Sequence, residues 1–146
     1  MIKIIYAQDT LINKALERFN DRVEEVIMIY GNNEAQTIED ILKTAHSQNK
    51  KFRVIVVDSS PEYHGRSTLK RLASHGIKCQ YTLISNAYFL IETVTKLFLP
   101  STYILCNGAL VAPMGSSILA CLANRHHVPV VAVCETYKFE DRVNLD

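Results

Sequence analysis

Two segments of this chain are continuously apolar and rich in β-branched side chains, Val54–Val57 and Val128–Val133. A strand with one face in water alternates apolar and polar residues, whereas a strand covered on both faces is apolar throughout. Strand-like runs recur at residues 26–30, 53–58, 78–84, 103–106 and 129–134. The pattern therefore predicts a sheet that is covered on both sides.

Amphipathic segments separate these runs. Their apolar positions fall on single helical faces: Ala35, Ile38, Ile41, Leu42 and Ala45; Leu69, Leu72 and Ala73; Phe89 or Leu90 with Val94 and Leu97; and Ile118, Leu119, Leu122 and Ala123. Strand alternates with helix along the chain, which is typical of parallel sheets with right-handed crossovers. We predict an α/β fold, a Rossmann-like three-layer sandwich with a mostly parallel sheet of five or more strands.

The length of 146 residues suits one domain. Residues 10–22 have the spacing of a helix, and residues 1–6 are too apolar for a free tail. We expect residues 1–25 to form a strand and helix segment at the end of a truncated helical region, and residues 26–146 to form the Rossmann-like domain.

Charge and cysteine usage exclude several functions. Sixteen basic and fifteen acidic side chains leave a net charge of +1, which favours neither nucleic-acid nor membrane binding. The four cysteines form no CxxC pair and have no histidine at zinc-finger spacing, so we expect no metal and no disulfide. They lie in or beside apolar segments, which predicts buried thiols in a reducing compartment, the cytoplasm.

The turns that follow the strands form the expected binding face, because ligands of open α/β sheets bind at the carboxyl ends of strands. Neither a dinucleotide fingerprint nor a GxxxxGK[ST] loop occurs, so no cofactor is expected. Asp58 could accept a proton, bind a ribose or cap a turn. Arg66, near the start of a helix, could hold a phosphate or face solvent.

The turn at Asn107–Ala109 has few side chains that could take part in a reaction. Asn107, Gly108 and Ala109 follow a strand-like run, and a helix is predicted to begin at Gly115. No acid, base or nucleophile stands between Ala109 and Pro113. An active site there is either absent or lost.

The segment after the last strand has two aromatic side chains and two opposite charges: Glu135, Tyr137, Lys138 and Phe139. Exposed aromatic residues beside charges are typical of an interface. Packing of both rings beneath the loop is an equal alternative.

Several motifs occur in an order that resembles a known family. They are Asp58-Ser-Ser-Pro-Glu-Tyr-His-Gly-Arg66, Cys106-Asn-Gly-Ala109, Met114-Gly-Ser116, Val128-Pro-Val-Val131 and Cys134-Glu-Thr-Tyr-Lys-Phe-Glu-Asp-Arg-Val143. Together they resemble the C-terminal domain of the regulatory subunits of eukaryotic translation initiation factor 2B, from about Val26 onward. The last motif resembles the delta subunits more than the alpha or beta subunits.

The same superfamily contains isomerases of methylthioribose 1-phosphate and ribose 1,5-bisphosphate. Their pattern implies a reactive cysteine at the position of Gly31, an aspartate at the position of Ala109, and an arginine at the position of Ser60. Without the thiol and the carboxylate, proton transfer loses both partners. The degenerate pocket implied by the resemblance comprises Gly31, Asn32, Asp58, Ser60, Arg66, Asn107, Gly108, Ala109 and Gly115.

The resemblance implies a non-catalytic regulatory and scaffold subunit of the guanine nucleotide exchange factor for initiation factor 2, which helps to sense the phosphorylated factor. Implied partners are a beta-type subunit first, then alpha, gamma and epsilon subunits and initiation factor 2, in a dimer or higher oligomer. The alternatives are a sugar-phosphate isomerase, or a pseudo-enzyme that binds a sugar phosphate or nucleotide as a regulator.

Overall fold

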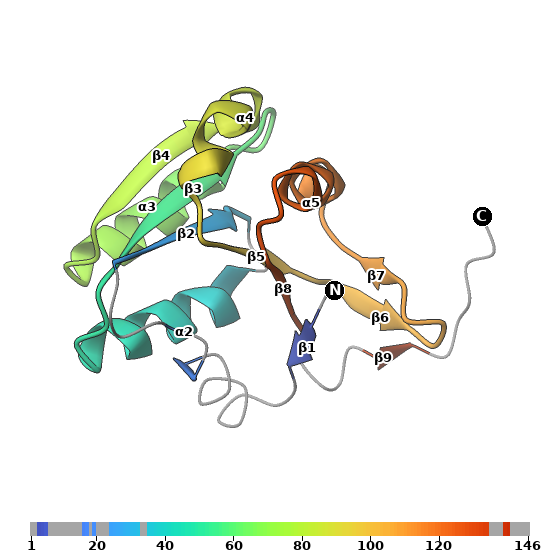
Figure 1. Ribbon diagram of the computed structural model, residues 1–146, viewed down its shortest axis with the longest axis horizontal. Coiled ribbons are helices and arrows are strands. Elements are labelled where there is room, and N and C mark those ends of the chain that lie inside the picture. Colours follow the sequence, from blue (N-terminus) through green and yellow to red (C-terminus); the bar gives the residue numbers. More distant parts are fainter. Residues whose placement is uncertain are drawn as a thin grey trace.

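A computed structural model of the chain describes residues 3–5, 16, 17, 19, 24–32, 35–134, 139 and 140. Helices and strands alternate through most of this range (Figure 1). The strands are β1 (Lys3–Ile5), β2 (Glu25–Tyr30), β3 (Phe52–Asp58), β4 (Cys79–Leu83), β5 (Lys96–Pro100), β6 (Tyr103–Leu105), β7 (Leu110–Val111), β8 (Val130–Val133) and β9 (Phe139–Glu140). The helices are α2 (Gln36–Ser47), α3 (Gly65–Ser74), α4 (Ala87–Leu90) and α5 (Ser116–Arg125), with 3₁₀ turns η2 (Ile84–Asn86) and η3 (Ile91–Thr93).

The main sheet has six strands in the order β1-β8-β5-β2-β3-β4, and every pairing in it is parallel. Successive side chains of β2 point to opposite faces, as the pleat of a strand requires. Ile27 and Ile29 belong to one buried cluster and Met28 to the other. The prediction of a Rossmann-like, mostly parallel sheet is therefore confirmed.

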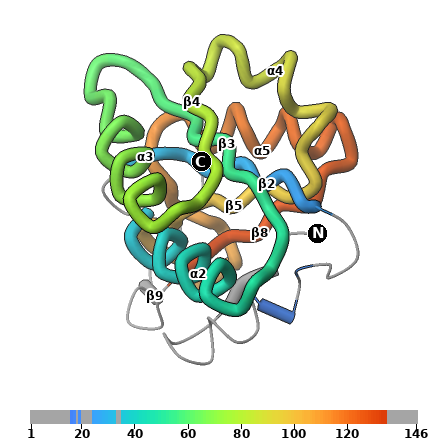
Figure 2. The backbone as a smooth tube through the Cα atoms, turned by 90° about the vertical axis from the view of Figure 1, so that its left-hand side faces the viewer, coloured from blue at the N-terminus to red at the C-terminus, as the bar shows by residue number. Residues whose placement is uncertain are grey.

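Helices cover both faces of this sheet. α2 and α3 lie side by side on one face (Figure 2), and the predicted α2 stripe from Ala35 to Ala45 is fully buried there. α4 and α5 cover the other face, where Ala87, Leu119 and Ala123 contribute to the core. Ala73 and Ile118, predicted to share these buried faces, are exposed instead.

The predicted helical stripe from Phe89 to Leu97 is wrong. Helical structure stops at Thr93, Val94 adopts an extended backbone, and Lys96–Pro100 forms the central strand β5 between β2 and β8. Leu97 and Phe98 are both fully buried, on opposite faces of the sheet. A short apolar run has no periodicity that distinguishes a buried strand from a helix. Pairing with neighbouring strands therefore determines which structure the segment adopts.

The predicted strand at residues 103–106 also needs correction, because it does not join the main sheet. β6 pairs antiparallel with β7 and parallel with β9 in a separate three-stranded sheet (Figure 1). Asn107–Gly108 forms the β6–β7 hairpin turn, in which Leu105 N–H donates to the Ala109 carbonyl at 2.9 Å. Asn-Gly is a strong hairpin signal, and Gly108 has the positive φ of 82° that such turns favour.

The described parts of the N-terminal segment pack onto the same sheet. β1 pairs with β8, and Leu16 and Phe19 join the core cluster beneath α2. The Phe19 ring lies 5.4 Å from that of Phe52, edge to face. The apolar start of the chain thus contributes a strand, while the division at residue 25 stays a prediction.

The prediction of four buried thiols is wrong for two of them. Cys134 is buried and Cys79 half-buried, but Cys106 and Cys121 are exposed. Cys106 follows β6 in the small sheet, and Cys121 lies on the outer face of α5. In the described part of the chain, no helix is long and apolar enough to cross a membrane.

We expect a thiol reagent at pH 8 to modify Cys106 and Cys121 within minutes and Cys79 far more slowly. Burial raises the pKa of the Cys79 thiol to about 11, which leaves little of the reactive thiolate at that pH. Mass spectrometry of the quenched reaction would identify the modified residues. Early labelling of Cys79 or Cys134 would contradict the burial of these side chains.

Candidate functional site

A cavity of about 440 Å³ lies at the point where the chain stops adding strands to one side of β2 and begins adding them to the other side. From β2 the chain adds β3 and then β4 on one side, and β5 afterwards pairs with the other side of β2. Such a switch point leaves a crevice at the carboxyl ends of the strands, where open α/β sheets bind ligands. The lining residues are Tyr30, Gly31, Asn32, Asp58, Ser59, Ser60, Pro61, Glu62, His64, Thr102, Pro113 and Met114.

Two glycines allow the start of α3 to pack closely against the ends of β2 and β3 beside the cavity. Gly31 N–H donates to the Val57 carbonyl at 2.8 Å, which extends the β2–β3 pairing past the end of the strand. A Cβ atom on Gly31 would lie 2.4 Å from Gly65 Cα, and one on Gly65 would lie 2.7 Å from Asp58 Cγ. The start of α3 therefore packs onto the ends of β2 and β3 at a distance that no side chain allows.

Asp58 is a structural carboxylate at the end of β3. It is 1% exposed, and its oxygens accept hydrogen bonds from Ser59 N–H and Tyr81 Oη, each at 2.9 Å. Desolvation, reinforced by the interaction with Asp58 and opposed by Arg66, raises the pKa of Tyr81. Of the three roles considered for Asp58, these bonds support turn capping.

The N-terminus of α5 approaches the cavity through Gly115. This residue has a φ of 98°, which favours glycine, and a Cβ atom on it would lie 3.0 Å from Tyr30 Oη. Tyr30 Oη is in turn 2.6 Å from Ser59 Oγ, so these two hydroxyls are hydrogen-bonded to each other. Both hydroxyls are thus fixed at the wall beneath α5.

Asn32 and Glu62 provide hydrogen-bond acceptors of different kinds. Asn32 is 8% exposed, and its Oδ1 atom is buried without a hydrogen-bond partner among the described residues. The Glu62 side chain is 72% exposed and lies 3.4 Å from His64 Nε2. The Glu62 carboxylate is thus accessible to solvent, whereas Asn32 Oδ1 is not.

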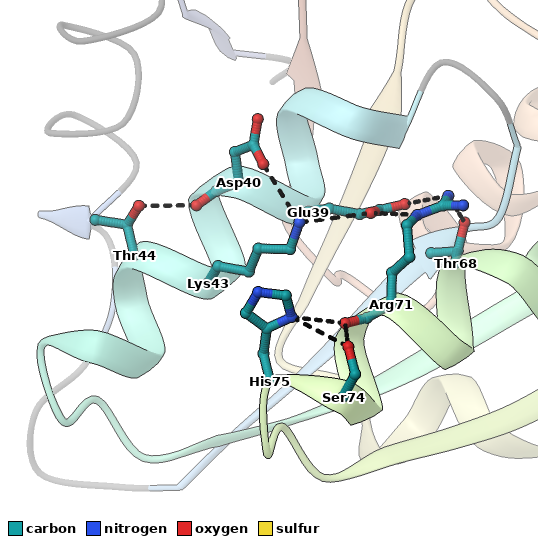
Figure 3. A network of polar contacts seen from close by, with 8 residues as sticks. All are labelled: Glu39, Asp40, Lys43, Thr44, Thr68, Arg71, Ser74 and His75. Carbon is teal, nitrogen blue, oxygen red and sulfur yellow. Dashed lines mark hydrogen bonds and ion pairs between the residues drawn. The ribbon is translucent and has the colours of Figure 1, made fainter.

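An ion pair between α2 and α3 fixes the helix that begins at this site (Figure 3). Glu39 is 1% exposed and accepts two hydrogen bonds from the Arg71 guanidinium, at 2.8 and 2.7 Å. The hydrogen bond with Glu39 raises the pKa of Arg71 above its ordinary value, although desolvation opposes it. Lys43 lies 3.9 Å from the same carboxylate and 3.5 Å from Asp40.

The structure brings only part of the predicted pocket together. Gly31, Asn32, Asp58 and Ser60 line the cavity, and Gly115 abuts Tyr30 behind it. Arg66 does not line it: the guanidinium stacks on the exposed Tyr63 ring, 5.2 Å from the ring centroid.

Asn107, Gly108 and Ala109 do not line this cavity either, which corrects their predicted place in a strand-to-helix turn. They form the hairpin between β6 and β7, where Asn107 Oδ1 accepts a hydrogen bond from Ala109 N–H at 3.0 Å. Thr102 lines the cavity instead. Sequence reasoning missed Thr102 because it missed β5, the strand that Thr102 follows.

The predicted interface lies mostly beyond the reach of the structure. Glu135, Tyr137 and Lys138 fall outside the described residues, while Phe139 begins β9 and pairs with Ile104. Within the described ranges, no cluster of three or more histidine, cysteine or acidic side chains could hold a metal ion.

Comparison with known proteins relates this arrangement to one family. The profile of the initiation factor 2 subunit family matches residues 1–146. The delta subunit of translation initiation factor eIF2B from Schizosaccharomyces pombe is 42% identical over 144 residues, which cover 99% of this chain and 30% of that protein. A ribose 1,5-bisphosphate isomerase from Thermococcus kodakarensis is 32% identical over 136 residues, 90% of this chain and 42% of that enzyme.

A solved structure shares the fold. One chain of the tetrameric eIF2B β2δ2 complex from C. thermophilum superposes with a TM-score of 0.83 at 28% identity, over 92% of this chain and 43% of that chain. The sequence described here thus spans less than half the length of each of these three relatives.

Proposed function

Because the chain belongs to the initiation factor 2 subunit family, we propose that it acts as a delta-like regulatory and scaffold subunit of the guanine nucleotide exchange factor for initiation factor 2. The higher identity to a delta subunit than to an isomerase, 42% against 32%, supports the delta-like assignment. The subunit would work in the cytoplasm and contribute to sensing of the phosphorylated factor.

The close packing around Gly31 is the observation that most strongly supports a non-catalytic function. The resemblance to the isomerases assigns their reactive cysteine to this position. A Cβ atom there would lie 2.4 Å from Gly65 Cα, a backbone atom that cannot move without shifting the start of α3. The site therefore has neither the thiol nor the room for one.

The position of Ala109 supports the same conclusion. The isomerase pattern assigns an aspartate to this position, but Ala109 lies in the exposed β6–β7 hairpin and does not line the cavity. General acid–base catalysis requires the proton-transfer group within hydrogen-bond reach of the substrate. Both features disfavour a sugar-phosphate isomerase.

The lining of the cavity also disfavours the second alternative, a pseudo-enzyme that binds a sugar phosphate or nucleotide. The described lining includes two carboxylates and neither lysine nor arginine. Phosphate sites in proteins rely on cationic side chains and free backbone amides. The side chains present would repel a phosphate rather than attract it.

We propose a beta-type subunit as the first partner, with alpha, gamma and epsilon subunits and initiation factor 2 in the larger assembly. The β2δ2 complex among the related structures supports assembly with other subunits of this factor. Glu135, Tyr137, Lys138 and Phe139 are the proposed contact residues.

Replacing Tyr137 and Phe139 by alanine should weaken association with a beta-type subunit by about 30-fold or more, because the loss of even one interface hot spot costs about 2 kcal/mol. Sedimentation of the full-length protein with its partner would measure this loss, and circular dichroism should be unchanged. Phe89→Ala is the matched control, since Phe89 is a 76% exposed aromatic residue on α4. Unchanged association of the double variant would reject this interface, and failure to associate with any partner subunit would reject the scaffold function.

A further inference from the structure

β4 forms an open edge of the main sheet. It pairs with β3 on one side, and no described strand pairs with its other side (Figure 1). Val54 N–H donates to the Lys78 carbonyl at 2.9 Å. Successive residues of a strand direct their N–H and C=O groups to alternate sides, so those of Cys79, Tyr81 and Leu83 point away from β3. These groups are arranged to pair with one more strand.

β4 lacks the features that normally protect such an edge. Open edges of natural sheets usually carry a charged side chain, a proline or a bulge, which prevents pairing with another chain. Residues Cys79–Leu83 include neither a charged residue nor a proline, and their pairing with β3 is continuous, without a bulge. The side chains of Gln80 and Leu83 are exposed. The edge is therefore accessible to an added strand.

Positive charge surrounds this edge. Residues 63–91, which include α3, β4 and α4, contain no aspartate or glutamate but four basic residues, Arg66, Lys70, Arg71 and Lys78. Arg71 is paired with Glu39 of α2, whereas the other three are exposed. An acidic strand added here would meet complementary charge. A second copy of the same edge would meet like charge.

The cations of α3 have a spacing that suits an added strand. α3 lies beside β4 (Figure 2), and the Arg66 guanidinium interacts with the Tyr81 hydroxyl of β4. Lys70 follows Arg66 by one helical turn and so lies on the same side of α3. Four helical residues span about 6 Å, and alternate residues of a strand, whose side chains share a face, are about 6.6 Å apart. Acidic side chains at alternate positions can thus face both cations.

We propose that the outer edge of β4 binds an extended acidic segment of a partner protein, which adds a strand to the sheet. The segment has aspartate or glutamate at alternate positions. In this mode of recognition, main-chain hydrogen bonds give affinity and alternate side chains give specificity. Charge complementarity selects an acidic segment over a second copy of this chain. The edge shares no residue with the contact proposed for a beta-type subunit, so this partner is additional to the proposed function.

Residue-resolved amide hydrogen exchange of the isotope-labelled protein tests the proposal, with the acetylated and amidated peptide TVEVEVT as the probe. At nine-tenths saturation, exchange at Cys79, Tyr81 and Leu83 should slow by about tenfold, because the unbound tenth of the molecules still exchanges. The amides of Gln80 and Thr82, which face β3, should change little. Uniform slowing along β4, or no slowing at the three outward amides, would overturn the proposal.

Two methylated peptides distinguish strand pairing from simple attraction between charges. N-methylation of both glutamates removes the donors along one edge of the peptide, and N-methylation of two valines removes donors along the other edge. One methylated peptide should bind roughly tenfold more weakly than TVEVEVT, because two hydrogen bonds are lost, and the other should bind as the parent peptide does. Equal binding of the two methylated peptides would reject strand addition.

Substitution of one cation tests the charge selection. Lys70→Gln should raise the dissociation constant of TVEVEVT by about threefold, as expected for an exposed ion pair. Arg125→Gln is the matched control, since Arg125 is an exposed cation at the end of α5, on the other face of the sheet. Equal effects of the two substitutions would show non-specific attraction and reject the site. Equally tight binding of TVKVKVT, or protection of the same amides by a uridine hexanucleotide, would reject an acidic peptide as the occupant.

No other subunit is needed for these measurements. Peptide binding without subunit association would therefore reject the proposed function alone. Subunit association without peptide binding would reject only the strand-addition site.

Discussion

Replacing Gly31 by cysteine should lower the free energy of unfolding by about 3 kcal/mol, at the upper end of the usual cost of overpacking. The new Cβ atom would lie 2.4 Å from Gly65 Cα and 3.0 Å from Val56 Cγ1. Both neighbours are in the interior, and Gly65 itself is held against the Asp58 carboxyl group. Relief of the clash must displace the start of α3, so the variant should also fail to isomerise ribose 1,5-bisphosphate.

Urea denaturation of the variant and the parent protein would measure this loss. Gly108→Ala is a useful control, because a Cβ atom there meets nothing within 4 Å while φ is +82°. Left-handed strain alone costs about 1–2 kcal/mol, so the control should be the milder of the two. Equal stability of Gly31→Cys and the parent would mean that the site has room for a thiol. Turnover by the parent protein would contradict the non-catalytic function.

The parts of the fold that sequence predicted well are those with an unambiguous period. The α2 stripe repeats at helical spacing over three turns, and this predicts burial on one face. Residues Val54–Val57 of β3 are continuously apolar, and this predicts burial on both faces. The segment 87–100 failed because its apolar residues satisfy a helical stripe and a buried strand equally. Pairing of β5 with β2 and β8, a long-range property, decides between them.

The residues of the candidate site also fall into those whose position the sequence could predict and those whose position it could not. Gly31, Asn32, Asp58 and Ser60 directly follow strands that were predicted correctly, so their position at the carboxyl edge could be predicted. Thr102 follows the missed strand β5. Asn107–Gly108 was assigned to the wrong kind of turn, although the dipeptide itself is a hairpin signal. Only the three-dimensional structure shows that Gly31 touches Gly65, because the contact joins residues far apart in the sequence.

Arg71→Ala should lower the free energy of unfolding by about 2 kcal/mol, below the 3–5 kcal/mol typical of a fully buried pair because Arg71 is partly exposed. The Arg71 side chain is 48% exposed, but Glu39 is 1% exposed. Among the described residues, Glu39 would keep Lys43, at 3.9 Å, as its ion-pair partner. The cost is thus mainly that of a buried carboxylate left without its hydrogen bonds. Thermal or urea unfolding would measure it.

Asp40→Ala is the control for this ion pair, since Asp40 is 48% exposed and its contact with Lys43 at 3.5 Å should contribute about 0–1 kcal/mol. The variant Glu39→Leu with Arg71→Leu separates the value of the pair from the penalty of breaking it. Replacement of both charges by apolar side chains removes the buried carboxylate, so most of the lost stability should return. If the double variant were as unstable as Arg71→Ala, the hydrogen bonds between Glu39 and Arg71 would themselves stabilise the packing of α3 against α2, and the desolvation account would be wrong.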